Sequence, residues 1–206
     1  MRRAFYIIIL ALLPIVSHAQ SIADLARKAE TEKNPLSKYS ITGSCHNGLY
    51  IVSEEEIVLS NNGDPVLLHV YGVVNDGGIV YIPKEYEQLE LIKEGSTYED
   101  NVYKCEKNGK WGLVSSTNGT LLPCEYNSLS NKGNGIWRTF KNGKYGYVQL
   151  NRLSSITTLI PCIYESLGDY SSDSYIHATL KGKKGMIDGQ NKIIIPFEYS
   201  KVGNPC

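Results

Sequence analysis

The sequence lacks an excess of either charge: 21 lysines and arginines stand against 21 aspartates and glutamates. Without Arg2 and Arg3, 19 basic residues face 21 acidic ones, which gives no electrostatic reason to bind nucleic acid or an anionic membrane. Phenylalanine, methionine and tryptophan are scarce, at 3, 2 and 2 residues, whereas glycine and tyrosine are plentiful, at 19 and 15. This composition is typical of short strands joined by tight turns.

Motifs of common catalytic and metal centres are also missing. The sequence has no G-x-S-x-G, no H-E-x-x-H and no P-loop. No two cysteines have the C-x-x-C spacing, and the cysteine next to His46 has no second ligand pair nearby, so no zinc site is predicted. We therefore expect a protein that is not an enzyme, with no cofactor and no bound metal.

The first 19 residues have the features of an export signal. Arg2 and Arg3 precede an apolar run over residues 4–16, and Ser17-His18-Ala19 places small residues where a signal peptidase reads the chain. This run is short for a bilayer span, which needs about 20 residues. We expect cleavage after Ala19 and a periplasmic or secreted chain with no membrane span; an uncleaved anchor helix is the alternative.

The cysteines bear on the redox state of such an exported chain. Disulfides form in an oxidising compartment, and an odd number of cysteines leaves at least one thiol free or paired with another molecule. We interpret Cys124 and Cys162 as buried free thiols, because they follow repeat prolines where two other copies have Lys84 and Phe197. The pairing stays open among Cys45, Cys105, Cys124, Cys162 and Cys206.

Residues 20–66 are expected to form a short helix and a capping β segment. Ser21 can cap the helix, an apolar stripe at helical spacing follows it, and Asn34-Pro35 ends it. Downstream, Glu54-Glu55-Glu56 separates two strand-like runs. We interpret these three glutamates as a solvated turn or strand edge, with cation binding as the alternative.

Residues 67–206 repeat one pattern four times. A step of an aromatic residue and glycine is followed by a proline and then a tyrosine, with 12 positions from step to proline in three copies and 16 in the third. The glycines recur after 40, 34 and 39 residues, a period that marks a repeat architecture. The repeat positions are Tyr71, Gly72, Pro83 and Tyr86; Trp111, Gly112, Pro123 and Tyr126; Tyr145, Gly146, Pro161 and Tyr164; and, after Lys184, Gly185, Pro196 and Tyr199.

Each copy predicts a three-stranded antiparallel β unit. Asn108-Gly109 and Asn142-Gly143 favour type I′ hairpin turns, which need positive φ at both residues, and Gly182-Lys183 is their expected counterpart in copy four. A glycine inside a strand indicates that another backbone or a ring approaches closely. The proline is expected to close the third strand, because it donates no ladder hydrogen bond. One unit cannot bury its apolar face alone, so we expect an all-β array of stacked units.

This pattern resembles the WG-repeat family, bacterial proteins built from tandem units with a Trp-Gly step and a downstream proline and tyrosine. The resemblance covers about residues 67–202 and is carried best by residues 107–112 and 141–146. It implies a repeat β fold and no enzyme activity, since such repeats are taken to be interaction modules. Copy four departs from the pattern at Lys184, which suggests a capping unit whose outer face meets water.

These observations favour an exported, non-catalytic repeat protein that binds a protein or a glycan through its surface. Tyr98, Tyr170 and Tyr175 lie in or near the connections between repeats and are the candidate contact residues. The sequence leaves open the identity of the ligand, the oligomeric state, and whether the array is an open stack or a closed ring.

Two other classes of function are weighed against this one. A cell-envelope hydrolase would need a pocket in which His46, His69 or His177 meets a carboxylate. A structural assembly protein would use free strand edges or an intermolecular disulfide through Cys206. Non-reducing electrophoresis distinguishes the last of these, because a covalent dimer would be visible.

Overall fold

The computed structural model describes residues 27–28, 34–44, 47–60, 62–95, 97, 100–172 and 175–203. The predicted signal peptide, nearly all of the predicted N-terminal helix, Cys45 and Cys206 lie outside these residues. The described residues form sixteen β-strands in four antiparallel sheets, which confirms the all-β class. In this part of the chain no helix is long and apolar enough to cross a membrane.

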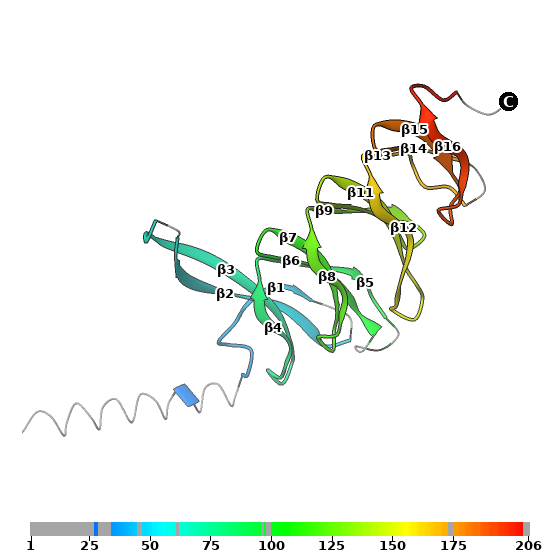
Figure 1. Cartoon of the computed structure of the whole chain (residues 1–206). Coiled ribbons are helices and arrows are strands. Elements are labelled where there is room, and N and C mark those ends of the chain that lie inside the picture. The colour runs from blue at the N-terminus through cyan, green and yellow to red at the C-terminus, as the bar shows by residue number, and fades with distance from the viewer. Residues whose placement is uncertain are drawn as a thin grey trace, which may run out of the picture.

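Each sheet consists of four strands that follow one another along the chain, and we number the sheets as units 1 to 4. Consecutive strands pair throughout each unit, so no connection crosses over a sheet (Figure 1). Unit 1 has β1 (Ser40–Ser44), β2 (Leu49–Leu59), β3 (Pro65–Asn75) and β4 (Val80–Tyr86); unit 2 has β5 (Gln88–Lys93), β6 (Val102–Lys107), β7 (Lys110–Ser115) and β8 (Thr120–Tyr126); unit 3 has β9 (Ser128–Gly133), β10 (Ile136–Lys141), β11 (Lys144–Leu150) and β12 (Ile156–Tyr164); unit 4 has β13 (Ser166–Leu167), β14 (Ile176–Leu180), β15 (Lys183–Ile187) and β16 (Ile193–Tyr199).

The structure corrects the predicted three-stranded unit to one of four strands. In units 2, 3 and 4 an additional strand begins two residues after the repeat tyrosine and pairs with the strand that follows it. β9 shows why the sequence pattern missed it: Leu129 is its one buried residue, and the other residues of Ser128–Gly133 are exposed. With so few apolar residues, β9 shows no alternation of apolar and polar side chains that would predict a strand. The strand is defined by its backbone pairing with β10.

The apolar core lies in the seams between successive sheets. In the first seam, Leu49, Val73 and Ile82 of unit 1 pack with Tyr103 and Val114 of unit 2. Similar clusters fill the seams between units 2 and 3 and between units 3 and 4. Successive residues of a strand point to opposite faces, so each middle sheet buries both of its faces.

The stack is open rather than closed into a ring. Figure 1 shows the sheets succeeding one another from β1–β4 to β13–β16, with the first and last sheets at opposite ends. The two middle units therefore each have two neighbouring sheets, and units 1 and 4 each have one.

The repeat glycine and proline build the same feature in all four units. Tyr71 pairs with Tyr86 and Val73 pairs with Ile82, so the stretch of β4 opposite Gly72 has two extra residues. The same register shift recurs in the other three units. The repeat proline lies within this bulge of an edge strand, so it does not close the strand as predicted.

The bulge explains why the step needs glycine. A Cβ atom on the step glycine would lie only 2.5–2.6 Å from a carbonyl oxygen of the bulged strand, too close for any side chain. The close approach comes from backbone in every unit, so the four glycines have the same surroundings. The carbonyls belong to Ile82, Leu122, Ile160 and Ile195, and the glycines are Gly72, Gly112, Gly146 and Gly185.

The Asn-Gly steps form the hairpin turns of units 2 and 3, as predicted. Asn108 and Gly109 have φ of 54° and 64°, and Asn142 and Gly143 have φ of 52° and 75°. In unit 4 the residues with positive φ are Lys181 and Gly182, so this turn lies one residue before the predicted Gly182-Lys183.

Unit 1 has a longer hairpin than the other units. β2 runs without interruption through the three glutamates, so the two predicted runs are one strand and not two runs separated by a turn. β1 pairs with β2 as far as Ser53, and β4 pairs with β3 only from Tyr71 to Val74. Residues 54–60 and 62–70, which we call the arm, are therefore a two-stranded ribbon that projects from the stack (Figure 1).

Candidate functional site

The repeat tyrosines lie at the ends of β4, β8, β12 and β16. Tyr86, Tyr126 and Tyr164 each pack into the seam with the following sheet, and burial raises the pKa of all three hydroxyls. The Tyr164 hydroxyl also donates a 2.6 Å hydrogen bond to Oδ1 of Asn191 in unit 4. Tyr199 has no following sheet among the described residues and is 48% exposed, against 2% for Tyr164.

The aromatic residues of the step pair with these tyrosines across the sheet. Tyr71 pairs with Tyr86, Trp111 with Tyr126, and Tyr145 with Tyr164. Two of the step rings carry a cation over one face. Lys104 Nζ lies 4.0 Å from the centroid of the Trp111 ring, and Arg138 Cζ lies 4.4 Å from that of Tyr145. The step aromatics are thus half-buried parts of the sheet, and Lys184 takes their place opposite Tyr199.

The residue directly after the repeat tyrosine holds the hairpin turn of the next unit. The Glu87 carboxylate accepts hydrogen bonds of 2.8 and 3.1 Å from the amides of Asn108 and Gly109. Asn127 Oδ1 accepts one of 3.2 Å from the amide of Asn142. This position was not predicted from the sequence, although a side chain that can accept a hydrogen bond directly follows each repeat tyrosine.

Glu165 occupies the same position between units 3 and 4. Its Oε2 accepts a 2.8 Å hydrogen bond from the amide of Gly182, and its Oε1 lies 2.8 Å from Nζ of Lys144 in unit 3. The hydrogen bond from Lys144, followed by that from Gly182, lowers the pKa of the Glu165 carboxyl. One partly exposed carboxylate thus links a strand of unit 3 to the hairpin of unit 4.

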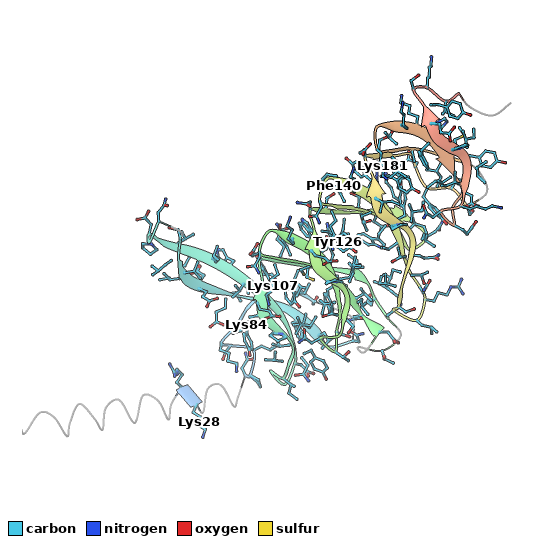
Figure 2. The ribbon with its side chains drawn as sticks, viewed as in Figure 1. Lys28, Lys84, Lys107, Tyr126, Phe140 and Lys181 are labelled. Atoms are coloured by element: carbon cyan, nitrogen blue, oxygen red, sulfur yellow. The ribbon has the colours of Figure 1, made fainter. Side chains whose placement is uncertain are left out.

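Beside the repeat tyrosines Tyr86 and Tyr126, ion pairs cross the first and second seams. Lys107 Nζ lies 2.8 Å from Oε2 of Glu85, and Lys141 Nζ lies 2.6 Å from Oε1 of Glu125. Figure 2 shows Lys84, Lys107, Tyr126, Phe140 and Lys181 following one another along the stack. In the third seam the positions that match Glu125 and Lys141 are Ile163 and Leu180.

Hollows open at the seams of the later units. One of about 400 Å³ lies between units 2 and 3 and is lined by Lys93, Asn131, Trp137 and Arg152, among others. Lys93 also reaches across this seam, 2.5 Å from the Arg152 carbonyl oxygen and 2.8 Å from Oγ of Ser154. A second hollow, of about 350 Å³, lies between units 3 and 4; its lining includes Lys132, Asn134, Gln149 and Tyr170.

The arm exposes apolar side chains next to carboxylates. Ile57 and Leu59 are 72% and 74% exposed, and their cross-strand partners Leu67 and Pro65 are exposed as well. The three glutamates that precede Ile57 are exposed too. Glu54 forms an ion pair with Lys84, which anchors the base of the arm to β4. The glutamates thus lie at a strand edge, one of the two interpretations of the sequence.

The tyrosines that the sequence predicts as contact residues lie apart from one another. Tyr170 packs against Tyr147, with ring centroids 5.5 Å apart, and Tyr175 is half exposed just before β14. Tyr98 lies outside the described residues. Tyr170 lines the hollow between units 3 and 4.

The histidines are placed on separate units. His69 is exposed on the arm, and His177 lies on β14 at the other end of the stack; His46 lies outside the described residues. In the part of the chain that the structure describes, no group of three or more His, Cys, Asp or Glu residues is placed to hold a metal ion.

Three cysteines lie within the described part, all with free thiols. Cys105 is buried in the first seam, and Cys124 is half-buried beside it. Cys162 is also half-buried, with Sγ 3.0 Å from Oγ1 of Thr139. Burial raises the pKa of the Cys162 thiol, while Thr139 and Lys141 act in the opposite direction.

Comparison with known proteins supports the repeat assignment. Residues 185–205 match a family model described as "WG containing repeat". The match begins at the step glycine of unit 4, the copy in which Lys184 departs from the aromatic pattern. It supports a WG-repeat family protein, in agreement with the resemblance predicted from the sequence. Neither a curated protein nor a solved structure matches the chain.

Proposed function

We propose that the chain is an exported, non-catalytic repeat protein that binds a protein partner through the arm. The stacked seams supply a rigid body, and the arm extends from it as a ribbon whose two outer edges are unpaired in the described part of the chain. A two-stranded ribbon is only marginally stable by itself in water. Exposed strand edges also offer backbone donors and acceptors to another strand.

The observation that carries this proposal is the exposure of apolar side chains on the arm. Ile57, Leu59 and Leu67 form an apolar tip, whereas most large apolar side chains of the stack lie in its seams. The neighbouring glutamates add negative charge between this tip and the base of the arm. A partner that presents an apolar strand or groove flanked by basic side chains would match this surface.

Site-specific photo-crosslinking tests the proposal. A photoreactive phenylalanine analogue is placed at position 57, and, as a matched control, at position 153, where Leu153 is 91% exposed in the connection between β11 and β12 of unit 3. We expect one defined protein adduct from position 57 in producing cells, none from position 153, and loss of the adduct when Leu67→Glu is added. Equal adducts at both positions, or none at position 57, would contradict a binding role for the arm.

A glycan is the second candidate ligand, favoured by the hollow between units 3 and 4. Tyr170 offers a ring, and Asn134 and Gln149 offer amides that can hydrogen-bond hydroxyl groups. Calorimetric titration with cell-envelope polysaccharides, on the native chain and on Gln149→Ala, tests this alternative. Unchanged heats for the variant would exclude this hollow as the binding site.

A further inference from the structure

Two thiols of unit 2 meet above the repeat glycine. Cys105 on β6 pairs with Gly112 on β7, and Cys124 lies in the bulge of β8 on the other side of β7. The two Sγ atoms are 3.4 Å apart. A Cβ atom on Gly112 would lie 2.8 Å from Cys124 Sγ, so the missing side chain leaves the space through which the sulfurs approach.

The same two positions hold other residue pairs in the other units. The residue opposite the step glycine is Val52, Cys105, Thr139 or Ala178 in units 1 to 4. The residue after the proline is Lys84, Cys124, Cys162 or Phe197. Unit 2 alone places a sulfur at both positions, and unit 3 places a hydroxyl opposite a thiol.

We propose that Cys105 and Cys124 are a redox-active pair that forms a reversible disulfide by exchange with a disulfide oxidant, such as oxidised glutathione. The sulfurs must approach by about 1.4 Å, because a disulfide bond is about 2.05 Å long. Side-chain rotation and a small adjustment of the bulge on the edge strand β8 supply this movement.

The two thiols differ in a way that assigns their roles. Cys105 is buried, and the hydrogen-bonding contact between the two sulfurs raises the pKa of Cys105 and lowers that of Cys124; Lys107 also lowers the pKa of Cys124. Cys124 is the more exposed of the two and is the sulfur that an oxidant can reach. Cys124 is thus the attacking thiol and Cys105 the resolving one.

The reaction proceeds in two exchange steps. The Cys124 thiolate attacks one sulfur of the oxidant, forming a mixed disulfide and releasing the first thiol of the oxidant. Cys105 then loses its proton and attacks Cys124 Sγ, forming the protein disulfide and releasing the second thiol. The pair loses two electrons and two protons, and the oxidant disulfide takes them up as two thiols.

The bond would connect β6 to the edge strand β8 across β7. It would close a loop that contains the end of β6, all of β7 and most of β8, and would hold the bulge against the first seam, where Tyr86 and Val114 lie. Fixing an edge strand in this way restricts the unfolded chain and opposes fraying of β8.

Glutathione redox buffers test the pair directly. The chain, with Cys45→Ser and Cys206→Ser, is equilibrated at increasing ratios of oxidised to reduced glutathione, alkylated and mapped by mass spectrometry. We expect a linked Cys105–Cys124 peptide while Cys162 remains alkylated, and a higher Tm for the oxidised form. A lasting glutathione adduct at Cys124, or free thiols at every ratio, would overturn the proposal.

Unit 3 supplies the matched controls. Cys105→Thr gives unit 2 the same hydroxyl–thiol pair that unit 3 has, so it should remove both the linked peptide and the Tm shift. Thr139→Cys should create a second linked pair with Cys162, since the two positions match those of Cys105 and Cys124. A Tm shift on oxidation that persists in Cys105→Thr would show that another thiol is responsible.

Discussion

The Glu165 carboxylate accepts a 2.8 Å hydrogen bond from the backbone amide of Gly182, at the hairpin turn of the following unit. Asn127 makes the equivalent contact one unit earlier, and Glu87 makes it two units earlier. Each unit is therefore held to its predecessor by this polar contact at the turn as well as by the apolar seam. Such nearest-neighbour contacts are the source of stability in a repeat array.

The first prediction concerns the pH dependence of this contact. Lys144 and the Gly182 amide lower the pKa of Glu165 in the folded state, so the carboxylate contributes stability above its unfolded-state pKa. That contribution is lost as the pH falls through the folded-state pKa. We expect Glu165→Gln to lower the Tm near pH 7 and to have no effect near pH 2, where the wild-type side chain is protonated.

Thermal melts across this pH range, followed by circular dichroism, measure the difference between the two proteins. Glu55→Gln is a suitable control, because Glu55 is exposed on the arm, away from the seams. A Tm difference for Glu165→Gln that is as large in acid as at neutral pH would contradict the electrostatic explanation.

The second prediction concerns the step glycine. A Cβ atom at position 146 would lie 2.5 Å from the Ile160 carbonyl oxygen and 2.8 Å from the Cys162 amide nitrogen, both backbone atoms that cannot rotate away. We expect Gly146→Ala to cost about 2–3 kcal/mol of unfolding free energy or more, measured by urea denaturation. Gly203→Ala, where a Cβ atom meets nothing within 4 Å, should cost little. Equal stabilities of the two variants would contradict the bulge argument.

The recurrence of glycine, proline and tyrosine predicted the repeat, because each of these residues meets a local backbone need that its spacing reveals. The step glycine marks the bulge, and Asn108-Gly109 marks a hairpin turn through its positive φ. The fourth strand could not be found in this way, because β9 has a single buried residue and depends on pairing with β10.

The candidate sites were less predictable than the fold. Cys105 of β6 and Cys124 of β8 lie close together because of the bulge in β8. Residue spacing alone does not predict this contact. The arm was hidden because Glu54-Glu55-Glu56 interrupts the apolar pattern, although exposed glutamates are acceptable in a ribbon solvated on both faces. The role of Glu87 and Glu165 at the turns could have been predicted, because each directly follows a repeat tyrosine. Hydrophobic periodicity does not detect such a polar position.

The third prediction compares one repeat position in two environments. Tyr164 is 2% exposed and donates to Asn191 across the last seam, whereas Tyr199 is 48% exposed with no following sheet among the described residues. We expect Tyr164→Ala to cost about 3–5 kcal/mol and Tyr199→Ala about 1 kcal/mol. Tyr164→Phe, which removes only the hydroxyl, should cost about 1 kcal/mol. Chemical denaturation ranks the three, and equal costs at positions 164 and 199 would mean that the seam does not decide stability.

The last prediction concerns the ion pair between Glu125 and Lys141, whose side chains are 44% and 31% exposed. Solvent screens a pair this exposed, so a double-mutant cycle should give a coupling of less than about 1 kcal/mol, falling further as salt is added. Unit 4 packs against unit 3 with Ile163 and Leu180 at the matching positions, which indicates that these two positions can pack without charges. We therefore expect the double variant Glu125→Ile with Lys141→Leu to fold with near-native stability and to lose the salt dependence of the pair. A coupling above about 2 kcal/mol, or a double variant that fails to fold, would show instead that the ion pair is essential to the second seam.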